Sequence, residues 1–208
     1  MKIIICEGIT EVALVYALSE KISKSFKVDK LGTIGQSPTN LIDDIYLINL
    51  RGNTHIKNVV KTLSKTLVDK EVKKIGFIMD ADNDFNAIKD NLEGKITILK
   101  NAGVEADYSY YILPKNDGTF GMSEDLIMKG LYKKSLMNLI NNHIYPNIEN
   151  HPEQNIKNPS KTKLMLFGAT QDPQSSSASF MLTRASALVN FDDEIFDGLK
   201  VFIENILN

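Results

Sequence analysis

The sequence predicts an α/β protein with an open, mainly parallel sheet that carries helices on both faces. Two observations favour this class. Short apolar runs, typical of buried parallel strands, alternate with segments of helical spacing over about the first 115 residues. The remaining chain shows mainly helical patterns. We therefore expect an α/β domain over residues 1–130, and a helical C-terminal extension over residues 131–208 that packs on it to form one compact unit.

The strands are predicted from four short runs rich in isoleucine, leucine, phenylalanine and tyrosine. Each run is bounded by charged residues, glycine or proline, and each has the length of a strand rather than of a helix. The runs are residues 2–6, 44–50, 73–79 and 108–114.

The first helix is expected directly after Gly8, over residues 10–26, where apolar side chains recur at helical spacing. Thr10 is its expected N-cap, which places Glu11 in the first turn, where the helix dipole favours a carboxylate.

Further helices are expected after the second and third strands and through the C-terminal extension. One is expected to be interrupted near Gly94, and Ser123 is the expected cap of another. The predicted helical segments are 51–68 after an initial turn, 85–103, 123–144, 158–169, 180–189 and 192–207, while 27–43 and 141–161 are expected to be irregular.

The bulk composition excludes several classes of protein. The chain has 208 residues, a net charge of −2 and a single cysteine, Cys6, so an internal disulfide cannot form. With a pI near 5.9, the chain has no overall attraction to nucleic acid or to an anionic membrane. The four apolar residues before Glu7 are fewer than the roughly 7–15 of a secretory signal or the roughly 20 of a membrane span. We expect a cytoplasmic protein with no membrane association, and the sequence leaves its oligomeric state open.

Acidic residues follow two of the predicted strands. Glu7 ends the first strand, Asp80 and Asp82 end the third, and Glu11 begins the helix above. The carboxyl ends of parallel strands share one edge of the sheet, where α/β proteins bind ligands. Carboxylates gathered there repel one another, and a divalent cation relieves that repulsion. Oxygen ligands without histidine or cysteine favour Mg²⁺ or Mn²⁺.

The "DADND" run, residues 80–84, also has features of three other motifs. An EF-hand loop would need glycine at 85 and glutamate at 91, where this chain has Phe85 and Asn91. An aspartate-nucleophile phosphatase places its DxD on the first strand, whereas this one follows the third. A glycosyltransferase DxD leaves the "CEGITE" run unexplained. Acids in solvated turns are the simplest alternative.

The two acidic motifs together resemble the TOPRIM domain of topoisomerases, bacterial-type primases and overcoming-lysogenization-defect nucleases. The EGxxE of "CEGITE" ends the first strand, the DxD of "IMDAD" ends the third, and the resemblance spans residues 1–130. The run "ILPKNDGTFGMSEDLI" resembles the P…G.LEDL segment of small stand-alone TOPRIM-like bacterial and archaeal proteins of unassigned function. This chain has Ser123 where that segment has leucine.

The resemblance implies a TOPRIM-like, Rossmann-like fold and a role for each acid. Glu7 would be a general acid/base or a ligand of a first metal ion, and Asp80 and Asp82 would be metal ligands. Glu11 would bind a second ion or act from outside the coordination sphere.

Residues outside the two motifs add further candidates. Glu124 and Asp125 can complete a second metal site, although acids are also common in any first helical turn. Lys161 and Lys163 can stabilise charge on a phosphoryl group, although surface lysines are common.

Two functions of different classes follow from this pattern. The first is Mg²⁺- or Mn²⁺-dependent phosphodiester chemistry on nucleic acid, most simply a small nuclease. The second is a non-catalytic module that binds nucleic acid or nucleotide through the metal, beside a partner ATPase or another defence protein. A metal-dependent phosphatase or glycosyltransferase is disfavoured by the position of the motif.

Overall fold

The computed structural model describes residues 1–22, 45–50, 56–68, 71–172, 174, 177–184 and 186–208. Its centre is a four-stranded sheet in the order β2-β1-β3-β4, in which every neighbouring pair is parallel. The predicted α/β class is therefore confirmed. The strands are β1 Lys2–Cys6, β2 Ile45–Asn49, β3 Lys74–Asp80 and β4 Asp107–Leu113.

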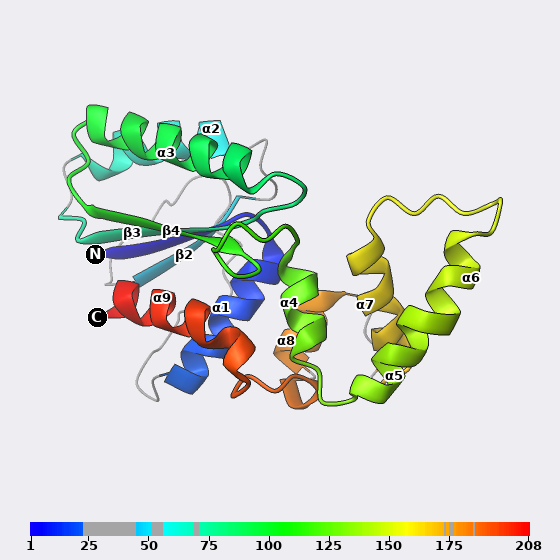
Figure 1. Ribbon diagram of the computed structural model, residues 1–208. Helices are drawn as coiled ribbons and strands as arrows, with labels where there is room; N and C mark the ends of the chain where they lie inside the picture. The colour runs from blue at the N-terminus through cyan, green and yellow to red at the C-terminus, as the bar shows by residue number, and fades with distance from the viewer. Residues whose placement is uncertain (23–44, 51–55, 69–70, 173, 175–176, 185) are drawn as a thin grey trace.

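Helices cover both faces of the sheet, as its apolar strands require (Figure 1). Helices α2 and α3 lie on one face, and α1 and α9 lie on the other. The principal helices are α1 Ile9–Ile22, α2 Ile56–Leu67, α3 Phe85–Asn101, α4 Ser123–Lys129, α5 Lys134–Leu139, α6 Tyr145–Glu149, α7 Pro159–Ala169, α8 Ala178–Arg184 and α9 Asp197–Leu207.

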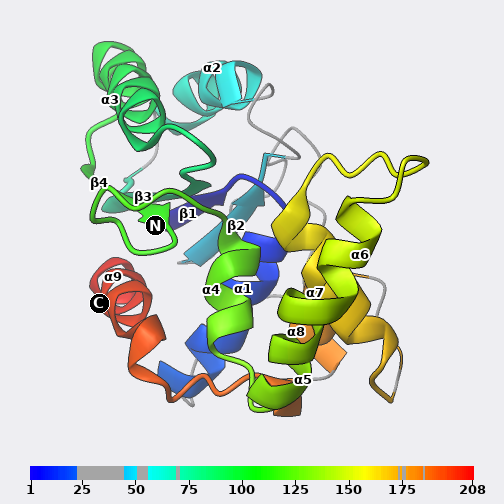
Figure 2. The ribbon, with the colours of Figure 1, turned by 45° about the vertical axis from the view of Figure 1, so that its right-hand side comes forward.

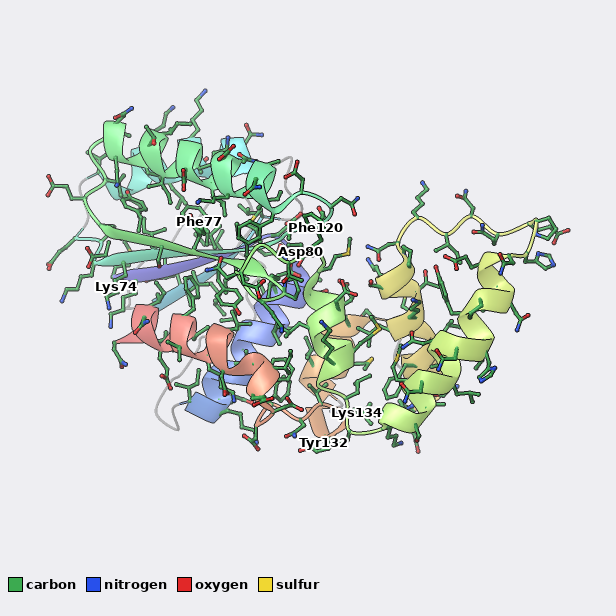
Figure 3. All side chains as sticks on the ribbon, viewed as in Figure 1. Lys74, Phe77, Asp80, Phe120, Tyr132 and Lys134 are labelled. Carbon is green, nitrogen blue, oxygen red and sulfur yellow. The ribbon has the colours of Figure 1, made fainter. Side chains whose placement is uncertain are left out.

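Successive residues of β1 point to opposite cores. Ile3 and Ile5 pack with the helices α2 and α3, where Phe77 of β3 is also fully buried (Figure 3). Ile4 and Cys6 face the other core, which continues into α4, α7, α8 and α9. The C-terminal helices thus share a hydrophobic core with the sheet. Figure 2 shows α4 and α8 next to α1.

Helix α9 packs along the sheet at the N-terminal ends of β1 and β3. Gly76 of β3 permits this approach, because a Cβ there would lie 3.0 Å from Ile206 of α9. The Lys2 and Lys74 ammonium groups each donate a hydrogen bond to a backbone carbonyl in the last turn of α9, at Leu207 and Asn205 respectively. The end of α9 is therefore fixed to the first strand of the chain.

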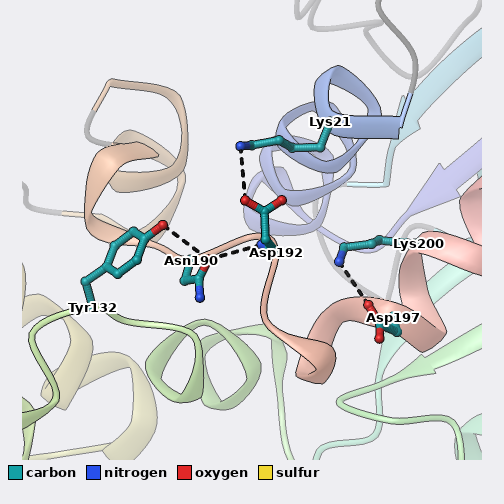
Figure 4. Close-up of polar contacts among 6 residues, drawn as sticks. All are labelled: Lys21, Tyr132, Asn190, Asp192, Asp197 and Lys200. Carbon is teal, nitrogen blue, oxygen red and sulfur yellow. Dashed lines mark hydrogen bonds and ion pairs between the residues drawn. The ribbon is translucent and has the colours of Figure 1, made fainter.

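Polar contacts hold the segment before α9 in place (Figure 4). Asp192 lies 3.6 Å from the Lys21 ammonium of α1, and the Tyr132 hydroxyl donates to Asn190 at 3.1 Å. Lys200 pairs with Asp197 in the first turn of α9 at 2.9 Å. These surface pairs orient the segment, although exposed pairs of this kind contribute little stability.

The predicted helix boundaries need two corrections around the sheet. Helix α1 begins at Ile9, so Thr10 lies in its first turn and is not the N-cap. Helix α3 is continuous through Gly94, because a single glycine costs a helix only about 1 kcal/mol and the flanking residues favour the helix.

The C-terminal extension differs more from the prediction. The expected helix over 123–144 breaks at Gly130, and the bridge between Leu131 and Val189 replaces the next turn. Ser123 is the first helical residue, and Met122 occupies the cap position. Part of the expected loop 141–161 is helical, in a π-helical turn at Ile140–Ile144, in α6 and at the start of α7.

Two expectations fall outside the described residues, namely the irregular stretch 27–43 and the turn that begins at residue 51. Among the described helices, none is both long and apolar enough to cross a membrane.

Candidate functional site

The candidate site lies at the carboxyl ends of β1 and β3. The chain leaves β1 toward β2 on one side and later returns to place β3 on the other. This reversal of strand order is the switch point at which open α/β sheets form a crevice for ligands. Asp80 marks this end of β3, and Lys74 marks the opposite end (Figure 3).

Glu7 and Asp80 meet across the two strands. The backbone N–H of Glu7 donates to the carbonyl of Ile78 at 3.1 Å, which continues the sheet beyond β1. The Glu7 side chain turns toward β3, and its Oε2 accepts from the backbone N–H of Asp80 at 3.3 Å. The sheet register therefore sets these two acids side by side.

Glu11 lies beneath them and is almost fully buried, with 3% of its surface exposed. As the third residue of α1, it reaches back so that Oε2 accepts the Gly8 N–H at 2.6 Å. This is the reciprocal half of a capping box. Gly8 suits this contact, because a Cβ at that position would lie 3.0 Å from Oε2 of Glu11.

Helix α4 brings its first turn against these acids. The backbone N–H of Ser123 donates to Oδ1 of Asp80 at 2.7 Å, and the buried Ser123 hydroxyl donates to Glu11. The same hydroxyl lies 3.3 Å from Oε2 of Glu124, which is also buried. We call Glu7, Glu11, Asp80 and Glu124 the carboxylate cluster.

Burial and the neighbouring charges both shift the pKa values within the carboxylate cluster. Burial, and then the charges of Glu11, Glu7 and Glu124, raise the pKa of Asp80 well above its usual value. Burial also raises the pKa of Glu11, and the hydrogen bond from Ser123 opposes that rise. Desolvation, with a contribution from Glu11, raises the pKa of the Cys6 thiol, so Cys6 is an inert buried side chain.

Asp82 and Asp125 lie beside the carboxylate cluster in different surroundings. Asp82 has a left-handed φ of 48°, its backbone pairs with Gly121, and burial raises the pKa of its carboxyl. Asp125 closes the start of α4, where Oδ2 accepts the Met122 N–H at 2.9 Å, while Oδ1 accepts the Ser160 hydroxyl of α7 at 2.6 Å. Asp125 thus joins two helices, whereas Glu124 belongs to the carboxylate cluster.

The two candidate lysines belong to α7 and not to a loop. Lys161 is exposed in the first turn, where its backbone N–H is capped by Asn158. The ammonium group of Lys163 lies 4.5 Å from the centre of the Tyr145 ring, in a cation–π contact. The structure gives neither lysine a contact with the carboxylate cluster.

The donor chemistry of the carboxylate cluster suits a hard divalent cation, because every ligand atom on offer is a carboxylate oxygen. Within the described part of the chain, however, no three acidic, histidine or cysteine side chains are placed so that they could hold a metal ion together. In this arrangement the Glu7, Glu11 and Asp80 oxygens each accept a hydrogen bond from a backbone N–H or from Ser123. An ion would have to exchange for some of these bonds.

Sequence reasoning did not find Ser123 as part of the site. It noted Ser123 only as a helix cap and as the departure from the P…G.LEDL pattern. The signal in the sequence is a serine where the resembled pattern has an apolar leucine, next to a Glu-Asp pair. A hydroxyl at a position suited to a buried leucine needs a polar partner, which here is Glu11.

Comparisons with known proteins give one result. A family model described as "Protein of unknown function (DUF3226)" matches residues 1–208. The chain matches no curated protein and no solved structure.

Proposed function

The chain belongs to the DUF3226 family, and from the carboxylate cluster we propose that it carries out Mg²⁺- or Mn²⁺-dependent phosphodiester chemistry on nucleic acid, as a small nuclease of TOPRIM type. One observation carries the proposal. Glu7 after β1, Glu11 of α1 and Glu124 of α4 gather with Asp80 at the switch point of the sheet, where burial and then their charges raise the pKa of Asp80.

Considered for stability alone, such an arrangement lowers the free energy of unfolding. Four acids of like charge converge in a largely buried position, where surface solvation would have been cheaper. Clusters of this kind are typical of functional sites, because the charge is needed when a cation and an anionic substrate are present. A dication held there would add positive charge, polarise a phosphate and lower the pKa of bound water.

The chain's own residues then divide the remaining work. Glu7 is partly exposed at the end of β1, so it is placed to accept or return a proton. Asp80 of β3 and Glu124 of α4 would be the ligands of the ion. Glu11 is fixed beneath them by hydrogen bonds from the Gly8 N–H and the Ser123 hydroxyl.

Binding an ion requires small side-chain rotations. Glu7 must release the Asp80 N–H, a bond that is already long at 3.3 Å. The proposal therefore predicts that metal affinity depends on pH, since protons and metal compete for the same oxygens.

Metal binding is tested by thermal unfolding with Mg²⁺, Mn²⁺ or EDTA. We expect the ions to raise the melting temperature of the wild type by about 5 °C or more, because saturation at 100 times Kd stabilises by about 2.7 kcal/mol. We expect no such rise in Asp80→Asn, and an unchanged rise in the exposed control Asp90→Asn. An equal shift in all three proteins would contradict the site.

Cleavage is tested with single- and double-stranded DNA, with RNA and with a generic phosphate ester. We expect metal-dependent cutting of a nucleic acid that falls about 100-fold or more in Asp80→Asn and Glu7→Gln. Turnover of the ester alone would overturn the nuclease proposal.

A second function is favoured by the net charge of −2, which gives the protein no overall attraction to DNA or RNA. It is a non-catalytic module that grips nucleic acid or nucleotide through the metal, next to a partner such as an ATPase or a defence protein. Metal-dependent binding without cleavage would support it.

A further inference from the structure

An open groove of about 780 Å³ lies between the loop after β4 and the helices α4, α5 and α7. Its volume is within the range of ligand sites. The lining combines apolar side chains with lysines from three different helices. Its charged and aromatic members are Phe120, Asp125, Lys129, Lys134 and Lys163.

The groove is basic although the whole chain is acidic. Three lysines line it against one carboxylate, Asp125, and that carboxylate already accepts hydrogen bonds from Met122 and Ser160. Among the lysines, Lys134 has an ion pair, at 3.7 Å from Asp193. Its side chain is still 64% exposed, so the pair leaves its charge accessible.

Phe120 lies in the loop before α4 and is 65% exposed (Figure 3). An exposed phenylalanine beside lysines is the combination with which proteins bind single strands, because bases stack on the ring while ammonium groups contact phosphates. A folded duplex offers no free base for such stacking. Phe120 therefore favours a single strand as the occupant.

The groove is joined to the carboxylate cluster by the first turn of α4. Ser123 donates a hydrogen bond to Glu11 of the cluster, and Glu124 is itself a member. The next residue, Asp125, lines the groove. A chain bound in the groove would thus reach the acids across one helical turn.

We propose that this groove binds single-stranded nucleic acid, with a base on Phe120 and phosphates at Lys129, Lys134 and Lys163, and delivers it to the carboxylate cluster. Delivery rests on the proposed function, whereas binding in the groove does not depend on metal.

Binding is measured by fluorescence anisotropy of a labelled single-stranded oligonucleotide in EDTA, over a range of salt concentrations. The test variant is K129A/K134A/K163A. Its control, K65A/K21A/K100A, removes the same charge outside the groove, from lysines matched one by one in their local contacts: the last turn of a helix, an exposed ion pair and a tyrosine ring. Lys65 is in the last turn of α2, Lys21 pairs with Asp192 at 3.6 Å, and Lys100 lies 5.6 Å from the Tyr108 ring centre.

We expect the test variant to bind about tenfold or more weakly and to lose about 2 from the slope of log K against log salt, because each phosphate contact on a single strand contributes about 0.7. The control should bind as the wild type does. Phe120→Ala should weaken binding roughly tenfold with an unchanged salt slope. Because Phe120 is exposed, this variant is not expected to unfold.

Three results would overturn the groove proposal: unaltered binding in the test variant, equal weakening in test and control variants, or stronger binding of duplex than of single strand. These outcomes are separate from those of the proposed function. Metal-dependent cleavage together with unaltered binding in the test variant would contradict the groove proposal alone. Binding in the groove without cleavage would contradict the nuclease proposal alone.

Discussion

Ser123 and Glu11 lie 112 positions apart in the chain, yet the serine hydroxyl donates a hydrogen bond to the buried glutamate. This contact ties the start of α4 to the start of α1 beneath the carboxylate cluster. It also lowers the pKa of Glu11 against the rise that burial imposes. Ser123, which replaces the leucine of the resembled pattern, therefore favours the ionised form of Glu11.

Ser123→Ala should destabilise the protein by about 1–3 kcal/mol at neutral pH, because it removes the hydroxyl that donates to a buried carboxylate. The difference should shrink as the pH falls and Glu11 becomes protonated. Urea unfolding at several pH values measures both effects. The control is Ser64→Ala, whose exposed hydroxyl bonds only a backbone carbonyl, and it should change stability by less than about 0.5 kcal/mol.

Asp80→Asn should be more stable than the wild type at neutral pH in EDTA. Burial and three like charges raise the folded pKa of Asp80 above its ordinary value of 3.8. Below that value both states are protonated, and the site contributes no difference. As the pH rises from about 4 through the raised folded pKa, the unfolded state loses its proton first, and the wild type loses stability.

The measurement is the free energy of unfolding of both proteins between pH 4 and pH 8. The gap should widen in favour of Asp80→Asn with rising pH, and Mg²⁺ should close or reverse it by stabilising the wild type alone. A wild type that gains stability relative to the variant with rising pH in EDTA would show that Asp80 is paired with a positive group.

Gly121→Ala should destabilise the protein by roughly 2 kcal/mol. Gly121 has a φ of 137°, which disfavours other residues, and a Cβ there would lie 2.8 Å from Oδ2 of Asp125. Gly94→Ala is the matched opposite case, because that helical position has no atom within 4 Å of an added Cβ. It should stabilise by roughly 0.5–1 kcal/mol. Urea unfolding distinguishes the two, and a loss in both would mean that α3 is strained at Gly94.

The sheet was the most predictable part of the fold. Its strands are short apolar runs buried on both faces, and their carboxyl ends necessarily share an edge, so the meeting of Glu7 with Asp80 follows from topology. The start of α3 was also predictable, because Asp84 caps it by accepting the Ala87 N–H at 3.0 Å.

Tertiary contacts decided what the sequence pattern missed. The break after α4 arises because Phe196 packs against Gly130, where a Cβ would lie 2.4 Å from its ring. The role of Asp125 is also decided by a contact that is distant in sequence, because its partner Ser160 is 35 residues away. Local periodicity carries no information about partners at such separations.

The attachment of α9 to β1 has a consequence for synthesis on the ribosome. Strand β1 keeps part of one face uncovered by α1 alone until the helix from Asp197 to Leu207 has emerged, because that helix supplies Ile203 and Ile206 to the core below Ile4. A nascent chain stalled before Asp197 should therefore expose part of this apolar face to chaperones, and Lys2 and Lys74 should acquire their carbonyl partners only after residues 205–207 have emerged.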